Sequence, residues 1–308
     1  MKFSFLIVLV CSSALIITAC KKSDSNNTTT DPTLELTAQA DDQSRFSNEV
    51  DAVANDANVA LSNSSSINGG RIESVICDAT MVIDSVSNPR TITITYNGTN
   101  CGGNRTRTGV VVLSLPAATQ WKNAGAALSV KFTNLKITRV LDNKSITING
   151  TKTMTNVSGG LLSNLASQQT ITHTITSSGL TVTFDDGTQR VWQIARQRVF
   201  TYSNGIVVTE SGTHTEGSVT NVAEWGTNRN GHAFTSAITE PVVVRQDCSF
   251  RIVSGKLEHK VSAITATATF GLNANGAPTT CPATGSSYYL KITWTVLGGT
   301  TKSIILPY

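Results

Sequence analysis

Arginine and aromatic side chains alternate in one segment, residues 190–202, with the sequence RVWQIARQRVFTY. In an extended strand, side chains two residues apart share a face, so Arg190, Trp192, Arg196 and Arg198 would lie together. A guanidinium group beside an aromatic ring can stack on a sugar or bind a carboxylate or sulfate through two hydrogen bonds. We predict that these four residues form a ligand-binding face. The sequence also allows a structural role, in which the aromatic rings cover the core and the arginines extend to solvent.

The other residues that could perform chemistry lack the spacing that catalysis requires. The Gly-x-Ser-x-Gly turn of α/β-hydrolases does not occur, nor does the helical His-Glu-x-x-His pattern of zinc proteases. The histidines stand singly in predicted strands: His173, His214, His232 and His259. A glycosidase needs two carboxylates across a cavity. The candidate carboxylates lie in predicted turns or polar strands: Asp185, Asp186, Glu210, Glu216 and Glu224. We therefore predict a protein that is not an enzyme and that uses no metal or cofactor.

The first twenty residues, MKFSFLIVLVCSSALIITAC, are typical of an export leader. A basic residue, Lys2, precedes an apolar stretch that ends in small residues before Cys20. The tetrapeptide Ile-Thr-Ala-Cys at 17–20 is similar to a bacterial lipoprotein box, so we predict a signal peptide over residues 1–19 and lipidation of Cys20. Acyl chains such as palmitate would then attach the protein to the outer membrane, on its periplasmic face or at the cell surface. The polar residues 20–37 are predicted to form a tether.

Four cysteines remain in the exported part: Cys77, Cys101, Cys248 and Cys281. In an exported chain they indicate two disulfides, for which three pairings exist. We predict the local pairing, Cys77 with Cys101 and Cys248 with Cys281, because each pair flanks a predicted hairpin. A zinc site is the alternative, but the sequence lacks a close Cys-x-x-Cys pair.

One helix is predicted near the N-terminus, over residues 38–66. Its apolar residues recur at three- and four-residue spacing. They are Phe46, Val50, Val53, Ala57, Ala60 and Leu61. This apolar face is thin and rich in alanine, which predicts a helix that lies against the domain.

Beyond residue 70 the sequence alternates with a period of two and is rich in threonine. Threonine is β-branched and favours strands, and only 14% of the residues are charged. Turn pairs separate the strands at Asp186-Gly187, Asn204-Gly205 and Asn230-Gly231. The absence of helical segments between strands excludes parallel βαβ units. The sequence therefore predicts an all-β fold of antiparallel hairpins, either a sandwich or an elongated curved sheet, with one N-terminal helix.

The two ends of the predicted β region are alike. In each, alternating threonines lead through a Gly/Asn turn to a cysteine: TITITYNGTNC ends at Cys101 and TATATFGLNANGAPTTC ends at Cys281. This likeness suggests two related β modules, 67–165 and 166–308.

Three segments carry a resemblance to a protein family. CGGNRTRTGVVVLSL (101–115), SITINGTKTMTN (145–156) and the closing arrangement of Gly255, Lys256 and Cys281 resemble uncharacterised threonine-rich, β-rich lipoproteins of the Bacteroidota. The resemblance covers most of residues 70–308. It implies an all-β lipoprotein, and because its motifs are structural it implies no catalytic residue.

We expect a lipid-anchored envelope or surface lipoprotein with a structural or binding function. Its expected partners are the membrane, through Cys20, and a glycan or an envelope protein. The formal net charge of +4 is too small to predict nucleic-acid binding. Two alternatives remain open: a secreted hydrolase that acts on polysaccharide or peptide, and a carrier that holds an apolar ligand in a curved sheet.

Overall fold

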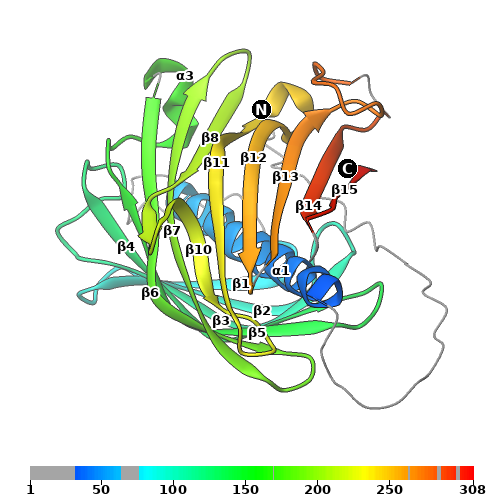
Figure 1. Ribbon diagram of the computed structural model, residues 1–308. Helices are drawn as coiled ribbons and strands as arrows, with labels where there is room; N and C mark the ends of the chain where they lie inside the picture. Colours follow the sequence, from blue (N-terminus) through cyan, green and yellow to red (C-terminus); the bar gives the residue numbers. More distant parts are fainter. Residues whose placement is uncertain (1–31, 64–75, 169, 263, 283–285, 296–298) are drawn as a thin grey trace.

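The computed structural model describes residues 32–63, 76–168, 170–262, 264–282, 286–295 and 299–308. One fifteen-stranded antiparallel sheet and one long helix dominate this part of the chain. The predicted signal peptide, Cys20 and residues 20–31 of the predicted tether lie outside the described residues. The predicted all-β class with an N-terminal helix is confirmed, and of the two predicted architectures the curved sheet is the one that forms (Figure 1).

The helical elements are α1 (Pro32–Asn63), η1 (Leu162–Asn164), α3 (Leu165–Gln168) and η2 (Gln246–Cys248). The strands are β1 (Ala79–Asp84), β2 (Arg90–Thr99), β3 (Arg105–Leu115), β4 (Ala126–Arg139), β5 (Ser145–Asn156), β6 (Thr170–Phe184), β7 (Gln189–Tyr202), β8 (Ile206–Gly212), β9 (His214–Glu216), β10 (Val219–Thr227), β11 (Ala233–Arg245), β12 (Arg251–Val261), β13 (Ile264–Leu272), β14 (Tyr289–Thr295) and β15 (Thr301–Pro307).

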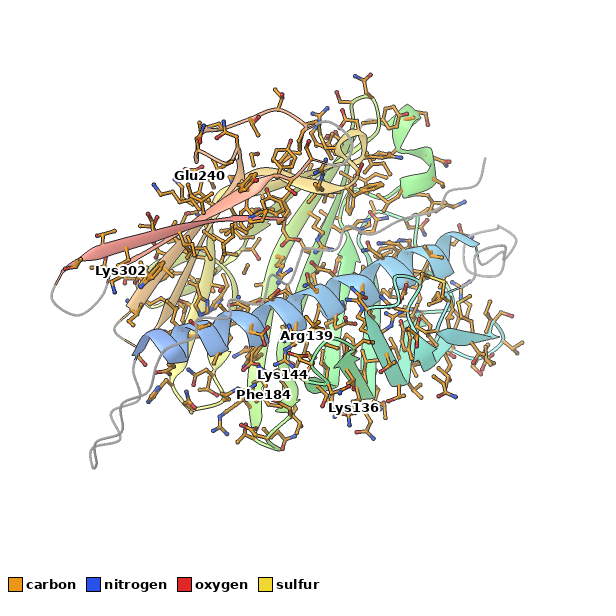
Figure 2. The ribbon with its side chains drawn as sticks, turned by 90° about the vertical axis from the view of Figure 1, so that its right-hand side faces the viewer. Lys136, Arg139, Lys144, Phe184, Glu240 and Lys302 are labelled. Atoms are coloured by element: carbon orange, nitrogen blue, oxygen red, sulfur yellow. A yellow bond between two sulfur atoms is a disulfide. The ribbon has the colours of Figure 1, made fainter. Side chains whose placement is uncertain are left out.

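Most strands pair with their neighbours in the sequence, so the sheet is a long meander from edge strand β1 to edge strand β15. Alternation within the strands sets its two faces. In β2, for example, Ile92 and Ile94 are fully buried, whereas Thr91, Thr93 and Thr95 face outward. The sheet bends, and α1 lies in the trough on its concave side (Figures 1 and 2). Apolar residues therefore line the trough, and threonines cover the convex face.

Helix α1 lies at the centre of the hydrophobic core. Four of its apolar residues have no exposed surface: Phe46, Val50, Val53 and Leu61. They pack in one cluster with residues from the first strands of the sheet, such as Ile92 of β2, and from the last ones, such as Phe234 of β11. The helix therefore packs against the domain as predicted, and its apolar face is part of the common core. The helix also begins at Pro32 and not at residue 38, so the last residues of the predicted tether are helical. Among the described helices, none is both long and apolar enough to cross a membrane.

The predicted division into two β modules does not correspond to two sheets. Strands β5 and β6 lie on opposite sides of the boundary at 165/166, yet they pair from Ile146 with Phe184 to Asn156 with His173. The hydrophobic core likewise contains residues from both sides of the boundary. In the described part of the chain, residues of both predicted modules thus share one sheet and one core around α1.

The predicted turns and disulfides are confirmed. All three turn pairs separate consecutive strands, although only Asn204-Gly205 has positive φ at both residues. The Asp186-Gly187 and Asn230-Gly231 turns have positive φ at glycine alone, as in longer hairpin loops that end on a left-handed residue. Cys77 bonds to Cys101 and Cys248 bonds to Cys281, with Cα–Cα distances of 5.4 and 5.5 Å. Each disulfide joins segments that are close in sequence.

We expect Phe46→Ala to lower the free energy of unfolding by about 3–5 kcal/mol, because it leaves a cavity at the centre of the core. Ser44→Ala is the control, since Ser44 is exposed on the same helix. Urea denaturation followed by circular dichroism measures both variants. Equal stability of the two would contradict the central position of α1.

Candidate functional site

Strand β7 places the predicted arginine–aromatic face on the inside of the sheet. Trp192 has no exposed surface, and Arg196 and Arg198 are 5% and 9% exposed. Trp192 packs edge-on against Phe46 of α1, with 4.9 Å between ring centroids. The prediction that these side chains share one face is right. The prediction that they contact a ligand from solvent is wrong for these three residues, because α1 covers them.

Arg196 and Arg198 bind carboxylates from three other elements. Arg198 pairs with Asp51 of α1 at 2.6 Å and with Glu210 of β8 at 2.5 Å. Arg196 pairs with Glu224 of β10, with Glu210 at 3.2 Å and with Asp51 at 3.3 Å. Burial alone would raise the pKa of Asp51, but the two guanidinium groups outweigh it and lower that pKa. We call these five residues the central charge cluster.

An interruption of the sheet brings Glu210 and Glu224 together. Strands β8 and β10 share the gap between β7 and β11, with β8 at one end and β10 at the other. They approach closely where β8 ends, since a side chain at Gly212 would collide with the carbonyl group of Asn221. Two carboxylates from different strands therefore reach the same arginine, Arg196.

A neutral hydrogen-bond network continues from the cluster. Gln43 donates to Glu224 at 2.9 Å and to Ser236, whose hydroxyl lies 2.7 Å from Nδ1 of His259. Burial lowers the pKa of His259 to about 4, so its ring is neutral at pH 7. A serine beside a histidine is the arrangement of nucleophilic catalysis. Here both residues are buried, and Glu224 contacts Gln43, Ser47 and Arg196.

The cavity beside this network has a volume of about 40 Å³. Its walls include Ser236, Glu224 and Leu257. A volume of this size accommodates ordered water, whereas pockets for small organic ligands measure roughly 300–1,000 Å³. The central region is therefore built to hold α1 in place, and a substrate of sugar or peptide size does not fit.

Acidic residues of α1 extend these contacts along the whole helix. The helix contains six acidic residues and one basic residue, Arg45. Five of the acidic residues pair with arginines of the sheet and its turns: Asp41 with Arg139, Asp42 with Arg229, Glu49 with Arg105, Asp51 with Arg198 and Asp56 with Arg107. The sixth, Glu35, accepts from Asn228 and contacts His232. The sheet thus holds its helix by charge as well as by apolar packing.

Sequence reasoning missed these partners, although a signal existed. Glu35, Asp42, Glu49 and Asp56 recur every seven residues. Seven residues make about two helical turns, so the four carboxylates form one stripe. Three of them are buried. Acidic residues that follow the apolar face of a helix indicate basic partners on the surface that receives it.

Among the described residues, Lys152 is the most deeply buried cation. It has no exposed surface, and its Nζ donates to the carbonyl oxygen of Val50 at 2.7 Å. Burial lowers its pKa to about 7, and the positive charges of Arg198 and Arg196 act in the same direction, whereas Asp51 opposes them.

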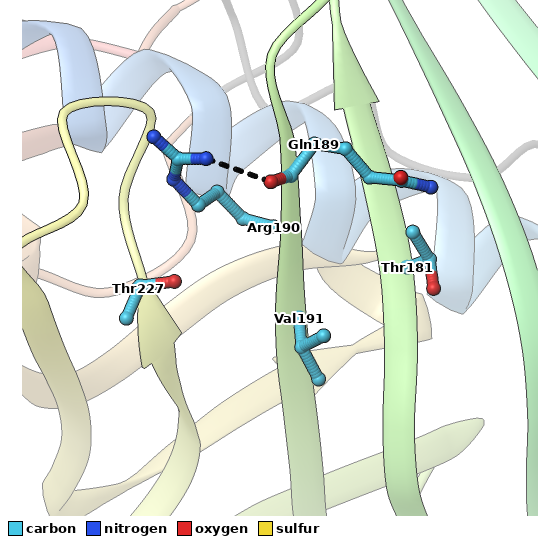
Figure 3. A pocket seen from close by; sticks show the side chains of 5 residues that line it. All are labelled: Thr181, Gln189, Arg190, Val191 and Thr227. Carbon is cyan, nitrogen blue, oxygen red and sulfur yellow. Dashed lines mark hydrogen bonds between the residues drawn. The ribbon is translucent and has the colours of Figure 1, made fainter.

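Arg190 is the one predicted binding residue that lines an outer surface. A depression of about 350 Å³ is formed by Thr181, Gln189, Arg190, Val191 and Thr227 (Figure 3). Arg190 donates to the carbonyl oxygens of Gln189, Asn228 and Arg229 at 2.8–2.9 Å. These bonds hold the turn that follows β10, so at least three of the donor hydrogens of Arg190 are used internally.

The one group of potential metal donors among the described residues consists of Asp247, Cys248 and Cys281. The two sulfur atoms are joined in a disulfide, and a disulfide sulfur is not the thiolate that zinc requires.

The chain matches no protein-family model, and no curated protein or solved structure is significantly similar to it.

We expect Arg196→Ala to lower the free energy of unfolding by about 3–5 kcal/mol, because it leaves the buried carboxylate of Glu224 without its cationic partner, whereas Glu210 keeps Arg198. Arg245→Ala is the matched control: Arg245 pairs with Asp247 on the surface, and its loss should cost less than about 1 kcal/mol. Urea denaturation distinguishes the two. A small effect at Arg196 would show that the cluster contributes little to stability.

We also expect a pH dependence from Lys152. The unfolded chain binds the lysine proton up to pH about 10.5, whereas the folded chain releases it near pH 7. The wild-type protein therefore gains stability relative to Lys152→Met as the pH rises through this window, by about 1 kcal/mol per pH unit. Lys131→Met removes an exposed lysine of β4 and is the control. A difference between wild type and Lys152→Met that stays constant with pH would contradict this account.

Proposed function

We propose that this chain is a lipid-anchored protein of the bacterial cell envelope with a structural or binding function and no catalytic activity. The position of α1 supports the absence of catalytic activity in this proposal. The helix fills the concave side of the sheet, and its carboxylates pair with the arginines there. The lipoprotein box that ends at Cys20 supports the anchor.

The carrier and hydrolase alternatives both need space that α1 occupies. A carrier would hold its apolar ligand in the trough, but Phe46, Val50 and Val53 of the helix fill it. A hydrolase would need access to a nucleophile, but Ser236 and His259 are 1% and 6% exposed. These contacts favour a rigid scaffold.

The convex face supports a binding function directed outward. Its strands present threonines in alternation, such as Thr93 and Thr95 of β2. Hydroxyl groups both donate and accept hydrogen bonds, so this face suits a glycan or an envelope protein with similar polar groups. The depression at Arg190 lies among these strands and is the part of the predicted ligand face that a partner could reach.

We expect wild-type cells grown with an alkyne-labelled palmitate to incorporate the label into this protein, and Cys20→Ala to abolish it. Cys11→Ala is the matched control and should keep the label, because the proposed cleavage removes Cys11 with the leader. Intact-mass spectrometry should show the loss of residues 1–19 and the addition of acyl chains. Label in Cys20→Ala, or a wild-type mass without lipid, would contradict the proposal.

A further inference from the structure

Two apolar side chains stand exposed in the turn between β4 and β5. Val140 and Leu141 are 51% and 72% exposed. The backbone of the turn is held in place, because Val140 donates to the carbonyl oxygen of Asn104 at 3.0 Å and Asn143 donates to that of Arg139 at 2.9 Å. An ordered turn that presents adjacent branched apolar residues loses little entropy when those residues are buried.

Helix α1 begins at the same end of the sheet as this turn. Glu35, in its first turn, contacts Asn228 and His232 between β10 and β11. Asp41 pairs with Arg139 at 2.8 Å. In an antiparallel meander the β4–β5 and β10–β11 turns lie at one end of the strands. The chain therefore enters the fold at the end of the sheet that carries Val140 and Leu141, beside the β10–β11 turn.

The proposed lipid anchor is close to this end. Eleven residues separate Cys20 from Pro32, and a segment of that length spans at most about 40 Å. Asp41 lies nine residues into the helix, or roughly 14 Å along its axis. The membrane surface that holds Cys20 is thus within reach of the turn.

Charges around the turn are nearly balanced. Arg139 pairs with Asp41 and Asp142, and Lys144 lies 4.0 Å from Asp41. Figure 2 shows Lys136, Arg139 and Lys144 together on this side of the helix. Farther along the same end, Asp185 and Asp186 pair with Arg229. Basic groups beside an apolar tip can reach lipid phosphates while the tip enters the acyl boundary.

We propose that the β4–β5 turn inserts Val140 and Leu141 into the interfacial layer of the lipid bilayer and so fixes the orientation of the anchored protein. This proposal rests on the proposed lipid anchor at Cys20. Its partner is a lipid surface, and the apolar contact supplies the affinity because the surrounding charges are mostly paired. The opposite end of the sheet, where Val86 lies between β1 and β2 and Val157 follows β5, would then face away from the membrane.

The experiment compares two acylated variants, each with one fluorophore, at opposite ends of the sheet. Both are placed in vesicles of phosphatidylethanolamine and phosphatidylglycerol. A polarity-sensitive dye is attached to Leu141→Cys or, as the control, to Val86→Cys, which replaces a 94% exposed valine in the β1–β2 turn. We expect a lipid-phase quencher to act at least about threefold more strongly on the dye at 141 than at 86. Equal quenching at the two positions would overturn the proposal.

A second comparison tests the contact itself. Val140→Asp in the Leu141→Cys protein should reduce the quenching at least about threefold, because a carboxylate beside the tip resists entry into the acyl boundary. Val157→Asp introduces the same charge at the opposite end and should leave the quenching unchanged. If Val140→Asp and Val157→Asp changed the quenching by the same factor, insertion of the turn would be contradicted.

The outcome is separable from that of the lipid anchor, because mass spectrometry first establishes whether Cys20 is acylated. If it is acylated and the dye at 141 is not quenched, the anchor stands and insertion of the turn is wrong. If it is not acylated, vesicles are added to the free protein. Quenching at 141 then supports insertion without an anchor, and its absence overturns the proposal.

Discussion

The attraction between an acidic helix and a basic trough organises this fold. The apolar face of helix α1 is rich in alanine, and Phe46 is its only aromatic residue. Its carboxylates meet arginines that project from β3, β4, β7 and the β10–β11 turn. Isolated surface ion pairs contribute little, whereas breaking a buried pair is costly. The position of the helix along the trough is therefore set by where these charges meet.

This constraint has consequences for what the protein can do. A sheet that curves around its own helix has no room for a large ligand inside, so recognition is left to the convex face and to the turns at its two ends. The helix also fixes where the chain enters the fold, beside the β10–β11 turn and at the same end of the sheet as Val140 and Leu141. The same ion pairs that hold the core thus determine which end of the protein is nearest to the proposed anchor.

Features that depend on neighbours in sequence were predicted well. The alternation of TITIT gave strand β2 and its two faces, and the turn at Asn204-Gly205 lies where its φ preferences place it. The disulfides were predictable because each closes a short local loop. The burial of Arg196 could not be predicted in this way. Alternation with a period of two shows which side chains of a strand share a face, but it does not show whether that face contacts solvent or another element. An arginine on an inward face needs a distant carboxylate, here Asp51 and Glu224, which no local pattern reveals.

The sequence by itself determined the strands, their turns, the disulfide pairs and the single helix, because backbone preferences and side-chain alternation act over a few residues. Only the tertiary structure decided that both predicted modules form one sheet, that α1 is its core and that Trp192, Arg196 and Arg198 serve the interior. The modules join through β5 and β6, which are close in sequence, whereas the burial of α1 and of Arg196 and Arg198 depends on contacts between residues more than a hundred positions apart. Such pairing is a property of the whole arrangement, since each buried charge is stable only where the fold supplies its partner.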